Sequence, residues 1–338
     1  MKHVLKNLLI LAGFALLGVM GFIGWMAWIA SAAVPLKLNP QGVVDFDIRP
    51  GLGLKAAAQA MAEAGVGIKP WQFALLGRYA NMDRAIKAGS YEISPGVTPW
   101  QLLEKLTAGD VTQTEIVIVE GKTFRELRAK LNAHPDLKHD AADLSEAEIL
   151  QRIGASTPHP EGYFFPDTYL FAKQSSDLTI YRRAHQALQK RLASAWEQRD
   201  PSVPYKNMAE ALIMASIVEK ETGAAADRGK VASVFVNRLK RGMLLQTDPT
   251  VIYGLGERFD GNLRKADLLA DTPYNTYTRT GLPPTPISLP GMASIQAALN
   301  PPATDYLYFV ARGDGTSVFS RSLEEHNRAV NKYQRGRG

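Results

Sequence analysis

Glu219 lies near the end of a long apolar run, residues 208–222, which a glycine closes. If this run is one helix, its 3.6-residue period puts four residues on the same side as Glu219: Met208, Leu212, Ala215 and Ser216. Apolar surroundings raise the pKa of a carboxyl group, as a general acid working near neutral pH requires. Glu221 falls on roughly the opposite side, near Glu210, where we expect it to be solvated. The alternative for Glu219 is a carboxylate that snorkels past its neighbours or pairs with a nearby cation.

Helices and an ordered loop are expected to position Glu219. The periodicity predicts three helices in this part of the chain, at residues 178–199, 206–222 and 227–241. The segment 271–302 holds seven prolines and a Tyr-Asn-Thr-Tyr sequence, which is too rigid for a linker and suggests an ordered loop that lines a groove. The pattern from Tyr306 to Phe319, with Asp314-Gly315 between two apolar runs, predicts a β-hairpin.

The start of the chain predicts a membrane span. Residues 7–36 carry no charge, and residues 8–30 would form a helix of about 34 Å, enough to cross a bilayer core. Lys2 and Lys6 precede the span, so the positive-inside rule predicts a cytoplasmic tail at residues 1–7. The rest would lie on the periplasmic side of a bacterial inner membrane. A cleavable signal peptide is the alternative, although the apolar stretch is long for one.

A strand, a turn with glycine and a helix recur three times after the span, beginning near Phe46, Tyr91 and Ile116. Such units predict a small α+β module at residues 43–131. The first two resemble the half-units of a LysM domain, a peptidoglycan-binding module, and a spacer that only sets the distance from the membrane is the alternative. A polar linker at 132–159, containing one helix, and a larger α+β domain at 160–335 complete the expected α+β architecture.

Composition excludes several kinds of chemistry. The 338 residues are 46% hydrophobic and 21% charged, which suits two globular domains. The absence of cysteine excludes disulfides, thiol catalysis and cysteine-zinc sites. The six histidines show no zinc spacing, so we expect no metal and no cofactor. Without Lys2 and Lys6 the net charge of +6 falls to 6 − 2 = +4, a mild basic excess that suits an anionic polymer or a membrane surface, while the lack of long basic runs argues against nucleic acid.

Four segments of the second half occur together. They are residues 161–169 (EGYFFPDTY), the end of the Glu219 helix (IVEKET), residues 245–254 (LQTDPTVIYG) and residues 274–284 (YNTYTRTGLPP). As a set they resemble the YceG-like family, the endolytic murein transglycosylases, over nearly the whole chain. The resemblance implies a membrane-anchored lytic transglycosylase that cuts glycan strands of nascent peptidoglycan between N-acetylmuramic acid and N-acetylglucosamine. It implies peptidoglycan synthases as partners, and it places the catalytic glutamate at Glu219.

One well-placed carboxyl group suffices for the implied reaction. Neutral Glu219 would protonate the glycosidic oxygen as the bond to the muramic acid C1 breaks, and would then accept the proton of that sugar's C6 hydroxyl, which closes a 1,6-anhydro ring. An ordinary glycosidase needs a second carboxylate that acts as a nucleophile or directs water. Glu161 and Asp248 are the candidates for that role, and hydrolysis would be plausible if either lay across a cleft from Glu219.

The candidate substrate-binding residues offer short donors and acceptors that could orient N-acetyl and hydroxyl groups or steady Glu219. They are Gln246, Thr247, Asp248, Tyr253, Asn275, Tyr277 and Glu161. Because Thr-Asp-Pro and Tyr-Asn-Thr are also good turn sequences, a structural role is open for the loop residues among them. Two other functions also stay open: a non-catalytic peptidoglycan-binding scaffold that recruits synthases, and a lysozyme-type hydrolase.

Overall fold

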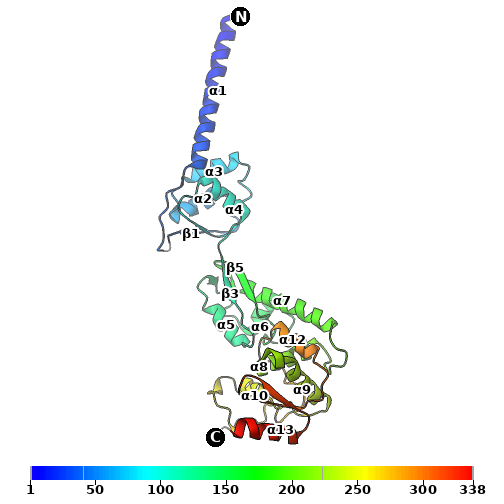
Figure 1. The fold of residues 1–338 in the computed structure, drawn as a ribbon. Helices are drawn as coiled ribbons and strands as arrows, with labels where there is room; N and C mark the ends of the chain where they lie inside the picture. Colours follow the sequence, from blue (N-terminus) through cyan, green and yellow to red (C-terminus); the bar gives the residue numbers. More distant parts are fainter. Residues whose placement is uncertain (1, 41, 223, 337–338) are drawn as a thin grey trace. The chain divides into compact units, whose positions relative to one another are not determined.

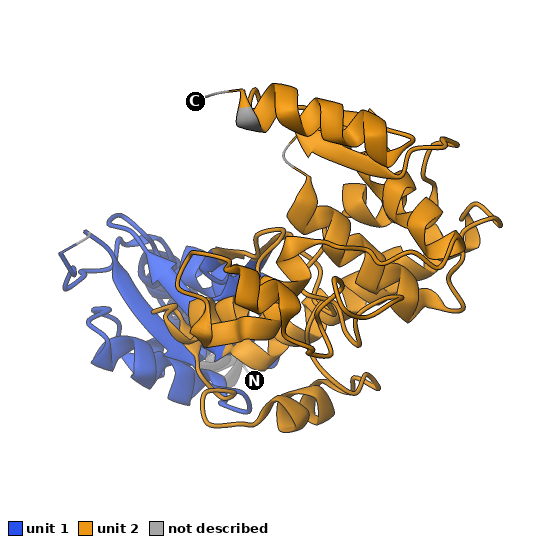
Figure 2. Cartoon of the chain, turned by 90° about the horizontal axis from the view of Figure 1, so that it is seen from below, with its two compact units in different colours: residues 1–114, 170–175 blue, residues 115–169, 176–338 orange. Residues whose placement is uncertain are grey.

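The computed structural model describes residues 2–40, 42–222 and 224–336, and the chain forms two compact units (Figures 1 and 2). Unit 1 comprises residues 1–114 and 170–175, and unit 2 comprises residues 115–169 and 176–338. This division differs from the expected module at 43–131 and linker at 132–159. The third strand-turn-helix repeat and the polar stretch after it belong to unit 2, because their helices bury apolar side chains such as Leu131 and Ile149 there.

Unit 1 is built on a two-stranded sheet covered by helices. Its elements are α1 (Lys2–Ser31), β1 (Val44–Ile48), α2 (Leu54–Glu63), α3 (Pro70–Tyr79), β2 (Gly89–Ile93) and α4 (Pro99–Ala108). The two strands pair antiparallel, with Val44 opposite Ile93 and Ile48 opposite Gly89. Alternate residues of β1 are buried, as a half-covered strand requires, and they join one core with α2, α3 and α4. The order β-α-α-β includes α3, a helix that the sequence pattern did not predict.

The long helix α1 is joined to the rest of unit 1 by packing at its carboxy-terminal end. Within it, Ile10–Ser31 is long and apolar enough to cross a membrane, and most of its side chains are exposed. Met26 and Ile29, in the last two turns, are instead buried, and Met26 belongs to the core cluster of unit 1. The end of this helix is therefore a part of unit 1 and not a free tether.

Unit 2 is mainly helical. Its helices are α5 (Phe124–Asn132), α6 (Glu146–Ile153), α7 (Asp177–Glu197), α8 (Met208–Glu221), α9 (Arg228–Lys240), α10 (Asp248–Leu255), α11 (Lys265–Leu269), α12 (Met292–Leu299) and α13 (Leu323–Val330). Its core lies among α7, α8, α9 and α12. Eight consecutive residues of α8, from Ala211 to Val218, are buried, which explains an apolar pattern that surrounds the whole helix.

Short strands complete the fold. They are β3 (Gln113–Val117), which pairs with β5 (Thr168–Ala172), β4 (Leu137–Lys138), which pairs with β6 (Ser175–Ser176), and β7 (Tyr308–Ala311), which pairs with β8 (Ser317–Ser320). The last pair is the predicted hairpin, with Tyr308 opposite Ser320. The three predicted helices of unit 2 are confirmed as α7, α8 and α9, with ends shifted by one or two residues.

The segment 271–302 is not one continuous loop, because it contains α12. This helix begins after Gly291, which has no side chain to cap it, and prolines lie on both sides, so the sequence carries no ordinary start signal. Likewise Asp248 lies at the start of the helix α10, although the sequence analysis placed it in a loop, and Tyr253 lies on the same helix. Burial of Ile295, Ala298 and Leu299 against α8 and α9 stabilises the helix that local signals do not specify.

Candidate functional site

Glu219 lies in the last turn of α8, half-buried, and faces the start of α12. The backbone N–H of Gly291 donates a hydrogen bond of 3.0 Å to Glu219 Oε2. Ser216, one turn earlier on the same side, accepts the N–H of Ile287 at 3.0 Å. The segment before α12 therefore runs along the predicted face of α8. The Glu219 carboxylate lies at the positive end of the α12 helix dipole, which favours negative charge there.

A second carboxylate, Glu120, converges on the same glycine. A Cβ atom added to Gly291 would lie only 1.8 Å from Glu120 Oε1, so the absence of a side chain at this position makes room for Glu120. Two backbone hydrogen bonds hold the turn that carries it: Gly121 N–H donates to Leu289 O at 2.8 Å, and Leu289 N–H donates to Lys122 O at 2.7 Å. Glu120 and Glu219 thus form a carboxylate pair at the amino end of α12.

The environment of Glu120 disfavours its ionised form. The residue is exposed at the surface, but partial desolvation raises the pKa of Glu120, the negative charge of Glu219 raises it further, and Arg228 acts in the opposite direction. A neutral Glu120 is therefore easier to form than a neutral glutamate in free solution. The sequence analysis missed Glu120. Its position before Gly121 in a strand-to-helix turn marks a tight turn, but nothing local indicates that this turn contacts α8.

Glu221 has a different environment from the one expected. It does point away from Glu219, but it is half-buried, and the expectation that it is solvated is wrong. The Thr247 hydroxyl donates a hydrogen bond to Glu221 Oε1. Burial raises the pKa of Glu221, the Thr247 hydrogen bond lowers it, and the nearby charge of Asp248 raises it. Thr247 itself is 2% exposed and donates its N–H to Thr276 Oγ1 at 3.1 Å, so it joins three segments behind the end of α8.

The remaining predicted polar residues near α10 are also engaged with protein groups. Tyr277 donates its hydroxyl to Asp248 Oδ1 at 2.5 Å. Gln246 is exposed, adopts a left-handed backbone with φ 52°, and accepts a hydrogen bond of 3.2 Å from Arg238. Asn275 is fully buried, and its amide nitrogen donates to three backbone carbonyls while its oxygen accepts the N–H of Tyr277 at 2.9 Å. For Asn275 the geometry therefore favours the structural role.

Glu161 lines a cavity of about 650 Å³ within unit 2. It is 7% exposed, and it accepts hydrogen bonds from the Phe124 N–H at 3.0 and 3.1 Å and from the Tyr253 hydroxyl at 3.1 Å. Burial raises the pKa of Glu161 to about 7. The cavity wall includes Lys220, which follows Glu219, and Thr123, which lies in the same turn as Glu120. The cavity and the carboxylate pair are therefore built from shared segments.

Neither residue proposed as a second carboxylate forms the pair with Glu219. Glu161 binds the amino end of α5, and Asp248 binds Tyr277, whereas Glu120 occupies the place beside Gly291. Within the part of the chain that the structure describes, no three His, Cys, Asp or Glu side chains are grouped so that they could hold a metal ion. What the arrangement offers is two neighbouring carboxyl groups next to a cavity, which suits acid–base chemistry on a polar substrate.

The fold and this site define a two-unit protein with a carboxylate-based candidate active site in its helical unit. The chain belongs to the YceG-like family, whose model matches residues 46–332. The endolytic murein transglycosylase of Bacillus subtilis is 34% identical over 319 residues, which cover 88% of this chain and 87% of that protein. The endolytic murein transglycosylase of Streptococcus pneumoniae D39 is 26% identical over 89% of this chain and 60% of its own length.

A solved structure has the same fold. The crystal structure of a YceG-like protein from Listeria monocytogenes matches 85% of this chain and 98% of its own chain, with 33% identity and a TM-score of 0.54. The α+β architecture predicted from sequence is therefore confirmed, and so is the family that the four motifs indicated.

Proposed function

We propose that this protein is a membrane-anchored endolytic murein transglycosylase, which cuts the β-1,4 bond between N-acetylmuramic acid and N-acetylglucosamine and leaves 1,6-anhydro ends. The observation that carries this proposal is the carboxylate pair of Glu219 and Glu120 at the amino end of α12. The relatives named endolytic murein transglycosylase support the substrate class. As in any enzyme of this class, peptidoglycan is the polymer cleaved, and no cofactor takes part.

In the proposed reaction Glu219 acts first as acid and then as base. Its proton moves to the glycosidic oxygen, and the electron pair of the bond to the muramic acid C1 leaves with that oxygen. The C6 hydroxyl of the muramic acid then attacks C1, and its proton returns to Glu219, so the enzyme regains its starting state and no water is consumed. Glu120, a second carboxyl group with a raised pKa beside Glu219, is proposed to assist by hydrogen bonding the substrate while the proton moves.

The cavity beside Glu161 is proposed to receive part of the glycan strand. Tyr253, Glu161 and Lys220 give its wall a hydroxyl, a carboxyl and an ammonium group, which can bind hydroxyl and N-acetyl substituents. Thr247, Asp248 and Tyr277 have a supporting role in this proposal, because they hold Glu221 and the start of α10 behind Glu219. Gln246, exposed nearby, is available to contact the strand.

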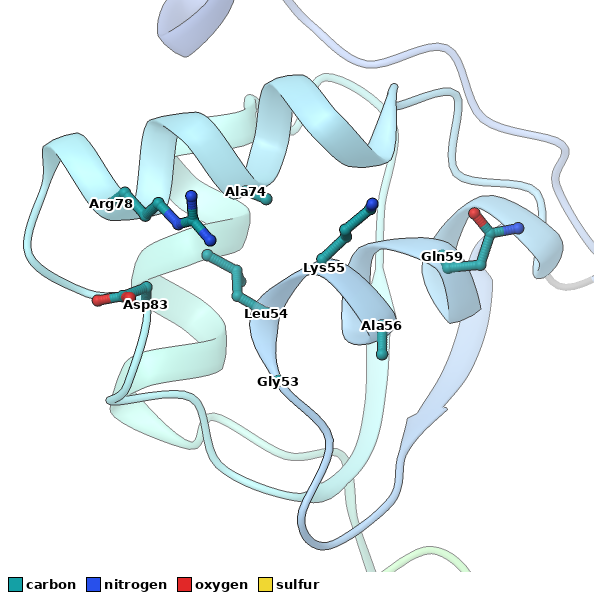
Figure 3. Close-up of a pocket in the computed structure, with 8 residues that line it drawn as sticks. All are labelled: Gly53, Leu54, Lys55, Ala56, Gln59, Ala74, Arg78 and Asp83. Atoms are coloured by element: carbon teal, nitrogen blue, oxygen red, sulfur yellow. The ribbon is translucent and has the colours of Figure 1, made fainter.

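Unit 1 is proposed to bind glycan as a LysM-like module. Its β1-α2-α3-β2 order agrees with such a module, and a cavity of about 610 Å³ lies between the start of α2 and α3. Figure 3 shows the residues that line it. The polar side chains around it are Lys55, Gln59, Arg78 and Asp83. The alternative, a spacer without affinity for glycan, predicts that Arg78→Ala leaves strand binding unchanged, which a pull-down with purified peptidoglycan measures.

We also propose that α1 anchors the protein in the bacterial inner membrane, with its amino end in the cytoplasm and units 1 and 2 in the periplasm. Peptidoglycan synthases are the partners that the family implies. Protease protection in spheroplasts tests the orientation: an added protease should degrade both units of the protein and leave only a short fragment that contains α1. Full protection would contradict it.

Product analysis tests the reaction. The full-length protein in detergent is incubated with purified glycan strands, because α1 contributes to the core of unit 1, and the new ends are identified by mass spectrometry. Anhydro ends support the proposal, reducing ends indicate a hydrolase, and intact strands indicate a scaffold. Glu219→Gln should abolish cleavage and leave strand binding intact. The matched control is Glu197→Gln, an exposed glutamate at the end of α7, which should retain full activity.

A further inference from the structure

Four of the five tryptophans in the chain gather where α1 meets unit 1. Trp25 and Trp28 lie in the last two turns of α1, and Trp71 and Trp100 each occupy the second position of a helix, in α3 and α4 respectively. Both of these helices contact α1. Trp71 is 54% exposed and Trp100 is 37% exposed, which is unusual for such large apolar side chains.

The depth of Trp71 follows from its contact with α1. The rings of Trp71 and Trp25 stack with centroids 5.9 Å apart and planes inclined by 26°. Along a helix that enters the bilayer at Leu8, Trp25 lies about 26 Å from the entry point, whereas the hydrocarbon core is about 30 Å thick. Trp25 is then still at the outer margin of the hydrocarbon, and a side chain stacked on it must lie at nearly the same depth.

Because the end of α1 packs into the core of unit 1, the depth of Trp25 also fixes the distance of unit 1 from the membrane. Met26 and Ile29 are 3% and 7% exposed, and the Val34 N–H donates a hydrogen bond of 2.8 Å to Val97 O just before α4. Lys69, exposed beside Trp71, places a cation where phospholipid headgroups would lie. Trp100 donates its indole N–H to Glu104 at 2.8 Å and leaves the rest of its ring exposed. An apolar ring with one polar edge is the side chain that prefers a membrane interface.

We propose that unit 1 rests on the outer surface of the membrane and inserts Trp71 and Trp100 into the phospholipid interface next to α1. This inference depends on the proposed anchor. It adds that the LysM-like unit does not extend away on a flexible stalk, but keeps its glycan-binding cavity close to the bilayer. Glycan that emerges at the membrane surface would therefore meet unit 1 there.

Single-tryptophan variants of the full chain test this surface. In each variant the four other tryptophans are replaced with phenylalanine, which preserves the aromatic contact at position 25. The protein is then reconstituted in vesicles of phosphatidylethanolamine and phosphatidylglycerol whose acyl chains carry bromine near the headgroup. The Trp71 variant should lose most of its fluorescence in brominated vesicles. The Trp196 variant is the matched control from unit 2 and should lose little. The Trp28 variant reports on the anchor itself.

The outcomes separate the inference from the anchor. Quenching of Trp28 without quenching of Trp71 would overturn the inference and leave the anchor in place, while loss of quenching at both would remove the anchor. Resistance of Trp71 to both bromine and aqueous iodide would indicate that protein, such as a second copy of this chain, covers it, and would also overturn the inference. If the multiple replacements prevent folding, a spin label attached to Lys69→Cys can report how deeply this position lies in the membrane. The chain has no other cysteine, so the label is specific, and a label on Glu197→Cys is the aqueous control.

Discussion

Replacing Gly291 with alanine should separate the two carboxylates while leaving the hydrogen bond to Glu219 in place. The backbone of Gly291 has φ −77° and ψ 170°, which alanine adopts without strain, and its N–H would still face Glu219 at 3.0 Å. The new Cβ would lie 1.8 Å from Oε1 and 2.2 Å from Cδ of Glu120. Because non-bonded carbon and oxygen atoms stay at least about 3 Å apart, the Glu120 carboxylate must move by about 1 Å or more.

The expected effect is a large loss of activity with little loss of stability. Glu120 is exposed enough to turn its side chain away, so we expect the free energy of unfolding to change by no more than about 1 kcal/mol. Displacement of a catalytic group by about 1 Å can reduce the rate by about 100-fold. Gly53→Ala is the control for stability, since Gly53 begins α2 with nearly the same backbone angles and has open space around it.

The assay is the rate of fragment release from glycan strands under single-turnover conditions, measured for Gly291→Ala, Glu120→Ala and the double variant. If the alanine acts by displacing Glu120, it should reduce the rate no further when Glu120 is already absent. Wild-type activity of Gly291→Ala would refute the role assigned to the pair. An equal loss in the Glu120→Ala background would show that Gly291 acts on the substrate and not through Glu120.

Variants at three further positions probe charge and burial. Glu120→Gln keeps the shape of the side chain and removes its ionisable group, so it should lower the rate of strand cleavage; a wild-type rate would contradict a role for this carboxyl group. Glu161 has a folded pKa of about 7 against an ordinary value of 4.5, so the folded state holds the proton more tightly. Wild-type stability should therefore fall by about 3 kcal/mol between pH 4.5 and 7, and urea unfolding of Glu161→Gln should lack this fall. Thr247→Val should lower the free energy of unfolding by about 1–3 kcal/mol by removing the donor to Glu221, and Thr247→Ser should restore it, whereas equal stability of all three proteins would contradict the hydrogen bond.

Sequence periodicity located much of the fold because it records which face of each helix is buried. The helices α7, α8 and α9 were predicted to within one or two residues, and the sides of Glu219 and Glu221 on α8 were assigned correctly. The predicted solvation of Glu221 failed, because a helix pattern does not reveal that Thr247 approaches from another segment.

What only the tertiary structure decided is which distant segments meet at Glu219. The turn with Glu120 lies far from α8 in the sequence, and the short helix α12 begins at a glycine without an N-cap side chain, so neither has a local signal. Both are held there by packing and by backbone hydrogen bonds between Gly121, Lys122 and Leu289. The amino-acid sequence by itself determined the candidate acid and the helix that carries it. Its partner was decided by long-range contacts, whose energies depend on the folded chain as a whole and leave no periodic pattern in either segment.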